Sequence, residues 1–256
     1  MSALLATRGL TVSIAGIPVC RDLDLTISPG ERWAILGCNG AGKTTLLHTL
    51  AGLRQPAAGT IELDGQRLDA MSPRDVARIR GLLPQDDSDA FGATVLETAL
   101  IGRHPHLSRW QWEGDNDLRI ARAALAALDI AHAESRDVRT LSGGERRRVA
   151  LATLFAQEPR LFLLDEPSTH LDLAHQLALL DRLTALAGGG AERAIVMVLH
   201  DVNLATRFCD HVLLLDKGEA IAGTATELLT AERLSRTYGV RLSKLAGPAS
   251  AVFAPE

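Results

Sequence analysis

One stretch of eight residues constrains the fold more than any other part of this sequence. It reads Gly-Cys-Asn-Gly-Ala-Gly-Lys-Thr at positions 37–44 and has the spacing of a phosphate-binding loop. An unbroken apolar run, Trp-Ala-Ile-Leu, precedes it at residues 33–36, and a run typical of a helix follows at residues 43–50. Because an apolar run without alternation predicts a strand buried on both faces, we expect an α/β fold with a mainly parallel sheet.

The loop has the residue types that phosphate binding needs. Glycines let successive backbone N–H groups turn toward phosphate oxygens, and the following helix adds the positive end of its dipole. Lys43 can reach the β- and γ-phosphates of a nucleotide, and the Thr44 hydroxyl is a hard oxygen ligand for Mg²⁺. A turn that binds nothing is the alternative, and the flanking strand and helix disfavour it. The predicted nucleotide contacts are Gly37, Cys38, Asn39, Gly40, Ala41, Gly42, Lys43, Thr44 and Thr45.

Acidic and imidazole groups end two further apolar runs. Residues 161–164 lead into Asp165 and Glu166, and residues 195–199 lead into His200. The carboxyl ends of parallel strands meet at one edge of a sheet, so these side chains should lie beside the phosphate site. Asp165 is suited to hold Mg²⁺, Glu166 to activate the attacking water, and His200 to hydrogen-bond the γ-phosphate or that water. Solvated surface charge and a structural histidine are the alternatives.

Periodicity elsewhere indicates a second sheet region and a helical excursion. Strands are predicted at residues 10–14, 23–27, 212–215 and 220–222, the first two as an antiparallel pair and the last two as a hairpin. Helical spacing occurs at residues 118–128, 145–155 and 173–186. Because strand signals vanish from about residue 86 to residue 159, we expect an inserted, mainly helical subdomain there.

The composition excludes several classes of protein. A chain of 256 residues with 46% hydrophobic residues fits one large α/β domain. A net charge of −4 provides no wide basic field, so we expect no nucleic-acid partner. Three cysteines without metal-ligand spacing argue against a disulfide framework and favour a reducing cytoplasm. No apolar stretch approaches the roughly 18 residues that span a bilayer, so a membrane function would need another chain.

A second anion-binding motif starts at Leu141. Ser142 has the character of a helix N-cap, with Glu145 in the capping-box position. The exposed N–H groups of Gly143 and Gly144 would form another anion site at the start of that helix. One chain therefore carries two candidate anion sites.

With these motifs in this order, the sequence resembles the ABC transporter ATPases over essentially its whole length. The stretch that looks like the family's signature motif is Leu141, Ser142, Gly143, Gly144 and Glu145. Gln85 looks like the Q-loop glutamine and His200 like the switch histidine. Residues 168–172, including His170 and ending in Asp172, resemble the D-loop.

The resemblance implies an ATPase that uses ATP and Mg²⁺ and works as a head-to-tail dimer. Each nucleotide would lie between the phosphate loop of one copy and the signature of the other, with Asp172 communicating across the interface. Gln85 would act with Glu166 and His200 in catalysis, and would join Thr44 and Asp165 at the metal.

The resemblance also implies how the chain is divided. We expect a single ABC ATPase domain over residues 1–256. Its RecA-like core and antiparallel β subdomain would occupy residues 1–85 and 160–240, and the helical subdomain with the signature residues 86–159. Residues 241–256 would be a short C-terminal tail, without a large regulatory domain.

The sequence departs from the family pattern at two points. The family commonly stacks an aromatic residue on adenine in the early strand region, whereas residues 13–16 offer only aliphatic contact. This departure predicts weaker nucleotide affinity and looser base selectivity. Cys38 stands where proline is frequent; its thiol could be redox-sensitive in an electropositive loop, or it could be a small tolerated side chain.

Two tasks compete for such an ATPase: powering a membrane permease, or acting as a soluble clamp or scaffold. A single ATPase unit disfavours the translation-factor-like branch of the second task. Residues 95–106 resemble the importer ATPases of iron-siderophore, haem and cobalamin permeases and would suit a groove for a permease helix, although an ordinary amphipathic helix and loop would give the same pattern. We expect a peripheral subunit of a metal-chelate importer on the cytoplasmic face of the inner cell membrane. Its partners would be a second copy, polytopic permease subunits and a substrate-binding protein that feeds them.

Overall fold

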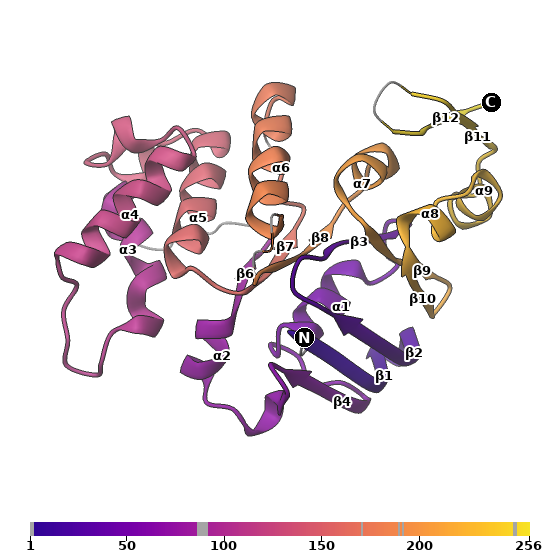
Figure 1. The fold of residues 1–256 in the computed structure, drawn as a ribbon, viewed down its shortest axis with the longest axis horizontal. Coiled ribbons are helices and arrows are strands. Elements are labelled where there is room, and N and C mark those ends of the chain that lie inside the picture. The colour runs from indigo at the N-terminus through magenta and orange to yellow at the C-terminus, as the bar shows by residue number, and fades with distance from the viewer. Residues whose placement is uncertain (1–2, 86–91, 170, 189, 191, 248–249) are drawn as a thin grey trace.

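A six-stranded sheet forms the centre of the molecule. The computed structural model describes residues 3–85, 92–169, 171–188, 190, 192–247 and 250–256. The sheet has the order β10-β9-β3-β8-β7-β6, and its strands are β3 (Arg32–Gly37), β6 (Arg80–Leu83), β7 (Leu161–Asp165), β8 (Ala194–Val198), β9 (His211–Asp216) and β10 (Glu219–Thr224). All neighbouring pairs are parallel except β9 with β10. Every residue of β7 and β8 is buried, as expected for central strands covered on both faces (Figure 1).

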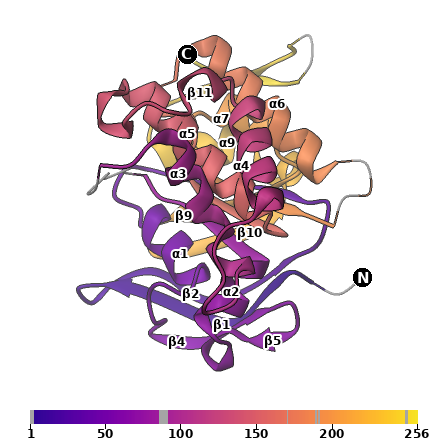
Figure 2. The same ribbon diagram turned by 90° about the vertical axis from the view of Figure 1, so that its left-hand side faces the viewer.

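A second, antiparallel sheet lies on one side of this centre (Figure 2). Its order is β2-β1-β4-β5, with strands β1 (Leu5–Ile14), β2 (Ile17–Ile27), β4 (Ala58–Leu63) and β5 (Gln66–Arg67). Helix α1 (Lys43–Leu50) lies between the two sheets, and one apolar cluster joins side chains of all three, among them Leu25, Ile35, Leu46 and Leu163. The phosphate loop, which precedes α1, is therefore held from both sheets.

Helices cover the other end of the central sheet. They are α3 (Val95–Leu100), η2 (Ile101–His106), α4 (Asp115–Ala127), η3 (Ala131–Ala133), η4 (Val138–Thr140) and α5 (Gly143–Gln157). Within residues 92–159 the only β pairing is a bridge between Thr94 and Asp137. Helices η2 and α5 approach closely at Gly102 of η2, where an added Cβ would lie 2.1 Å from the carbonyl oxygen of Thr153 in α5.

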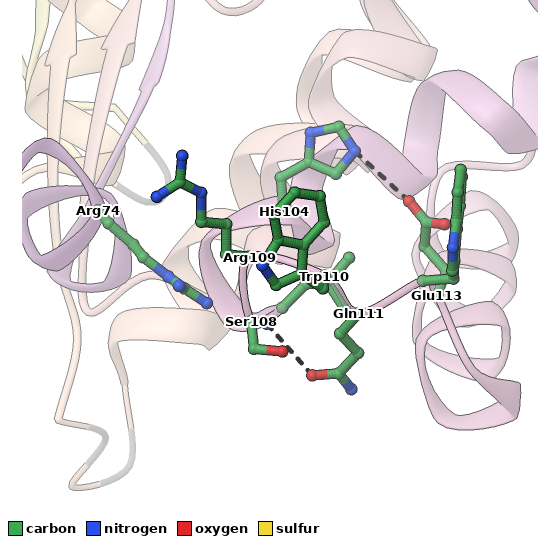
Figure 3. A pocket seen from close by; sticks show the side chains of 9 residues that line it. Arg74, His104, Ser108, Arg109, Trp110, Gln111 and Glu113 are labelled. Carbon is green, nitrogen blue, oxygen red and sulfur yellow. Dashed lines mark hydrogen bonds and ion pairs between the residues drawn. The ribbon is translucent and has the colours of Figure 1, made fainter.

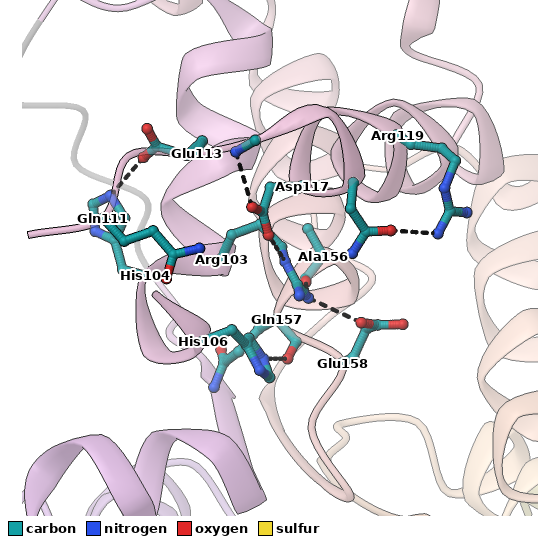
Figure 4. Close-up of polar contacts among 12 residues, drawn as sticks. Arg103, His104, His106, Gln111, Glu113, Asp117, Arg119, Ala156, Gln157 and Glu158 are labelled. Carbon is teal, nitrogen blue, oxygen red and sulfur yellow. Dashed lines mark hydrogen bonds and ion pairs between the residues drawn. The ribbon is translucent and has the colours of Figure 1, made fainter. Parts of the chain in front are cut away.

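A buried cation fastens these helices together. Arg103 is 5% exposed; its Nε donates to Asp117 at the start of α4, and its Nη1 donates to the Ala156 carbonyl and to Glu158 at the end of α5 (Figure 4). His106 contacts the neighbouring Gln157 carbonyl at 2.8 Å. Because a buried guanidinium is stable only when its donors are satisfied, this arrangement fixes η2 against both helices.

The other elements of the described residues pack against the two sheets or against one another. They are η1 (Leu68–Ala70), α2 (Pro73–Ile79), α6 (Leu173–Ala187), α7 (Val202–Phe208), α8 (Ala225–Leu228), α9 (Ala231–Tyr238), β11 (Leu242–Leu245) and β12 (Val252–Pro255). The last two strands form an antiparallel hairpin, and Phe253 exchanges backbone hydrogen bonds with the Asn203 side chain of α7. No helix in the described part of the chain has both the length and the apolar character to span a membrane.

The predicted fold class is confirmed: a mainly parallel α/β core carries an antiparallel β subdomain and a helical subdomain. The predicted helix at residues 43–50 has the observed bounds of α1. The sequence prediction was incomplete at β4, β5, α2 and β6, which are short, and at the hairpin within residues 241–256. Helix α4 begins three residues before the predicted position because Asp117 accepts a hydrogen bond from the Gly114 N–H and closes the first turn.

Candidate functional site

The phosphate loop connects the buried strand β3 to α1 with a backbone that needs glycine. Gly37, Gly40 and Gly42 have φ values of 150°, 79° and 91°. A Cβ at Gly37 would lie 2.6 Å from the Leu215 carbonyl oxygen, and one at Gly42 would lie 2.5 Å from the Val19 side chain. These close approaches come from β9 and β2, so both sheets shape the loop.

Lys43 turns its amine back into this loop. Its Nζ donates to the carbonyl oxygens of Gly37, at 2.9 Å, and Cys38, at 3.0 Å. Burial lowers the pKa of Lys43, and the nearby carboxylates of Glu166 and Asp165 act in the opposite direction. Phosphate oxygens at this position would add further negative charge and favour the charged amine.

Asp165, the last residue of β7, is a buried carboxylate without a partner. It is 0% exposed, and neither of its oxygens has a hydrogen-bond partner among the described residues. Burial raises the pKa of Asp165, while the Thr44 hydroxyl beside it acts in the opposite direction. An ionised carboxylate is costly in such a place unless a cation compensates it. The buried oxygens and the adjacent hydroxyl therefore form a donor set that fits Mg²⁺.

Glu166 is the point at which the other predicted side chains converge. Its Oε1 accepts a hydrogen bond from Gln85 Nε2 at 3.1 Å and lies 2.5 Å from His200 Nε2, and its Oε2 accepts one from the Thr169 hydroxyl at 3.2 Å. Gln85 follows β6, and His200 follows β8. Glu166 has a φ of 46°, an uncommon left-handed conformation for a residue other than glycine. The loops that follow β6, β7 and β8 thus bring three polar side chains to one carboxylate.

The signature residues lie at the exposed start of α5. Ser142 caps the helix, accepting from the Glu145 N–H at 3.3 Å, while Glu145 accepts from the Ser142 N–H at 2.8 Å. Ser142 and Gly143 are exposed, and Leu141 is buried beneath them. No hydrogen bond joins residues 141–145 to residues 37–45, all of which the structure describes. The second candidate anion site is therefore not part of the first site within one chain.

Comparison with known proteins identifies the family to which these motifs belong. A family model described as ABC transporter matches residues 20–169, more than half of the chain. The chain belongs to the ABC transporter family. It is an ATPase of that family.

Relatives of known name agree with this assignment. The chain is 42% identical to the hemin import ATP-binding protein HmuV of Myxococcus xanthus, over 94% of this chain and 94% of that one. It is 39% identical to the iron(3+)-hydroxamate import ATP-binding protein FhuC of Bacillus subtilis, over 92% of this chain and 88% of that one. A solved structure of an inward-facing metal-chelate type ABC transporter superposes with a TM-score of 0.85 at 30% identity, covering 100% of this chain and 98% of that one.

In this ABC ATPase Asp172, the residue predicted to end a D-loop, has a local structural role. Asp172 caps α6: its Oδ1 accepts a hydrogen bond from the His175 N–H at 2.9 Å, and the imidazole contacts the same carboxylate. These hydrogen bonds from His175, the backbone one foremost, lower the pKa of Asp172. The neighbouring D-loop residue His170 lies outside the described residues. A contact of Asp172 with a second copy stays a prediction.

Cys38 connects the phosphate loop of this ABC ATPase to the C-terminal part of the chain. The thiol is exposed and donates to the Thr237 carbonyl of α9 at 3.0 Å. Residues 13–16, for which a weak adenine contact was predicted, end β1 and form the turn before β2, where Ile14 is 37% exposed and Ile17 is 70% exposed. The sequence contained no sign that α9 would reach the loop, because the two segments are about 200 residues apart.

Arg147 is the residue at this site that the sequence did not single out. It is 2% exposed and donates to backbone carbonyls on both sides of the Gln85–Glu166 contact. Three consecutive arginines occupy positions 146–148, and composition alone does not distinguish the buried one. Which arginine is buried depends on which face of α5 packs against the core, together with the buried Val149 and Leu151. The sequence of the three arginines does not show that face.

Proposed function

We propose that this chain is the ATP-hydrolysing subunit of an importer for metal chelates, and that two copies close head to tail around two MgATP. The convergence of Gln85, His200 and Thr169 on Glu166, beside the unpartnered Asp165, is the observation that supports hydrolysis. The hemin and iron(3+)-hydroxamate import relatives, and the metal-chelate type transporter structure, support the cargo class.

Each side chain of the site has a distinct task in this proposal. The loop N–H groups and Lys43 bind the phosphates. Thr44 and Asp165 hold Mg²⁺, assisted by Gln85, and the ion when bound neutralises charge on the β- and γ-phosphates. Glu166 accepts the proton of the attacking water, and His200 donates a hydrogen bond to the γ-phosphate.

The exposed start of α5 supports the pairing of two chains. Ser142, Gly143 and the part-buried Gly144 present a helix N-terminus, which attracts anions, at a distance from the chain's own phosphate loop. In a two-fold dimer each signature can face the phosphate loop of the other copy, which generates two equal sites. Removal of the γ-phosphate by hydrolysis would then break contacts that hold the pair closed.

A surface on the helical subdomain supports the permease as a partner. We propose that the permease contacts Ile101 of η2, which is 51% exposed, together with the loop at residues 107–113. In that loop Trp110 is 88% exposed and Trp112 is 87% exposed, beside a pocket of about 440 Å³ that Arg74 and Arg109 line from one side (Figure 3). Exposed tryptophan next to arginine is the composition of a protein–protein hot spot. This location would make the chain peripheral, on the cytoplasmic face of the membrane.

The base of this loop is fastened on both sides. Arg103 joins η2 to Asp117 of α4, and His104 lies 3.4 Å from the Glu113 carboxylate across the loop (Figures 3 and 4). A loop that is held at its base loses little entropy on binding. The pocket presents two guanidinium groups, so the permease segment should offer a carboxylate and an apolar side chain.

The test is to purify the chain from detergent-solubilised membranes and identify what accompanies it. A polytopic permease that co-purifies, and whose reconstituted complex hydrolyses ATP faster with hemin, a ferric hydroxamate or cobalamin, would support the proposal and identify the cargo. The Glu166→Gln complex is the control for hydrolysis by other proteins. Recovery only in soluble complexes would overturn the permease proposal in favour of a clamp or scaffold.

A further inference from the structure

Arg147 connects the two loops that meet at the catalytic carboxylate. On one loop, its Nη1 donates to the Pro84 carbonyl at 2.6 Å and to the Gln85 carbonyl at 3.4 Å. On the other, its Nη2 donates to the Asp165 carbonyl at 2.6 Å and to the Glu166 carbonyl at 2.9 Å. One guanidinium thus holds the backbone of both hydrogen-bonded partners, Gln85 and Glu166.

The geometry of this contact suits arginine and no other side chain. Nε also donates to the Pro167 carbonyl at 3.4 Å, so the donors fan out in the plane of the guanidinium toward both loops. The group is permanently charged and 2% exposed, and carbonyl dipoles surround it. Lysine could donate to one loop, but its single ammonium cannot bridge both with parallel hydrogen bonds.

The backbone that Arg147 holds is an unusual one. Glu166 has a φ of 46°, and the two carbonyls that accept from Nη2 are that of the preceding Asp165 and that of Glu166 itself. A left-handed conformation at a residue with a side chain persists only when the surroundings enforce it. Arg147 therefore contributes directly to the direction in which the Glu166 carboxylate points.

We infer that Arg147 is a positioning residue for ATP hydrolysis. It holds the loop at Gln85 and the loop at Glu166 at the distance that lets Gln85 and His200 contact the Glu166 carboxylate. Arg147 is 2% exposed and donates to the backbone carbonyls of both loops, so it acts through the backbone of Gln85 and Glu166. The inference rests on the proposed role of Glu166 in hydrolysis.

The test compares Arg147→Met, which keeps length and loses every donor, with Arg147→Lys, which keeps the charge. We expect Arg147→Met to lower kcat about 100-fold, since a misplacement of about 1 Å costs a factor of that order. KM for ATP should stay within about threefold of the wild-type value, because the phosphate loop is untouched. Arg147→Lys should have an intermediate kcat, and it keeps the test open if the methionine variant does not fold.

Arg32→Met is the control, because it also removes a guanidinium that donates to a partner distant in the sequence, the Asp210 carboxylate, and that has no described contact with Gln85 or Glu166. It should lower the melting temperature and leave kcat per folded molecule near the wild-type value. If Arg147→Met behaves in the same way, Arg147 is only structural and the inference is overturned.

A double variant separates positioning from general damage. In a Glu166→Gln background, Arg147→Met should lower the residual rate by less than about threefold, because the group that it positions has already been replaced. An equal loss in both backgrounds would overturn the inference. Normal ATP turnover by Glu166→Gln would instead refute the proposed role of Glu166. Slow turnover by Glu166→Gln together with normal turnover by Arg147→Met would refute only the role of Arg147.

Discussion

Replacement of Ser142 by arginine should stop ATP hydrolysis while leaving the chain folded. The substitution removes the hydroxyl that accepts from the Glu145 N–H at 3.3 Å, whereas the bond from the Ser142 N–H to Glu145 at 2.8 Å can persist. Loss of such a cap costs about 1 kcal/mol. In a chain of this size that cost lowers the melting temperature by about 2–4 °C. A bulky cation at the exposed helix start, however, would block the nucleotide of the second copy.

The assay uses complementation between two inactive variants. Lys43→Ala removes the amine from the phosphate loop, and Ser142→Arg blocks the signature. A mixed dimer then has one site with both defects and one intact site. In an equal mixture about half of the dimers are mixed, and in each of these one of the two sites is active. ATP turnover should therefore recover to about a quarter of the wild-type rate. Ser142→Ala, which loses the same cap without adding bulk, should stay active.

Two distinguishable tags on the variants would show that mixed dimers form. If such dimers are present and the mixture is no more active than the two variants assayed separately, the head-to-tail pairing is refuted. A fall in ATP affinity of the Ser142→Arg monomer as steep as its fall in turnover would contradict it as well.

Glu166→Gln should lower kcat by about 10²–10⁴-fold, as loss of a general base does, and should accumulate as a dimer in ATP on size-exclusion chromatography; normal turnover would refute its role. Asp165→Asn should abolish turnover yet raise the melting temperature at pH 7 without Mg²⁺ by about 2–4 °C, the shift that 1 kcal/mol gives, because it removes a buried charge without a partner. Burial raises the pKa of Asp165, so its contribution to stability is full below the unfolded pKa and is lost as the pH rises through the folded pKa. The difference in melting temperature between Asp165→Asn and the wild type should therefore shrink as the pH falls. A difference that stays constant with pH would contradict the reasoning. Gly102→Ala should cost about 1–3 kcal/mol or more in urea denaturation, because its Cβ would lie 2.1 Å from the Thr153 carbonyl oxygen. Gly114→Ala, with nothing within 4 Å of its Cβ, should cost only about 0.5–1 kcal/mol, the cost of a less favourable helix N-cap.

The sequence was sufficient to place those parts of the candidate site whose position follows directly from a local pattern. The phosphate loop and α1 were predicted because a glycine-rich turn sits between an apolar strand and a helix. Asp165, Glu166 and His200 were predicted because each ends a buried strand, and the shared edge of a parallel sheet brings them together.

Other features depend on packing between distant segments and left no local pattern. Strand β6 has only four residues, including Gly81, and becomes a strand because it pairs with β7. The approach of α9 to the phosphate loop through Thr237 and Cys38 joins segments from opposite ends of the chain. Arg147 lies between two other arginines, and only the packed face of α5 makes it the buried one.

An unusual backbone conformation and a buried charge without a partner in the described part of the chain occur together in the loop at Asp165 and Glu166. Among the described residues, six non-glycine residues other than Glu166 have positive φ, for example Ala15 and Lys217, which lie in the turns of hairpins. Glu166 instead directly follows a fully buried parallel strand and adjoins Asp165, whose carboxylate has no partner among the described residues. Strain and an uncompensated charge at one place are retained when a ligand or a reaction uses them. The same loop is held by Arg147, whose helix begins with Gly143 and Gly144 about one turn earlier. In the proposed head-to-tail pair those glycines would face one nucleotide and Glu166 would face the other, so a single helix would connect the two sites through the backbone of the proposed catalytic carboxylate.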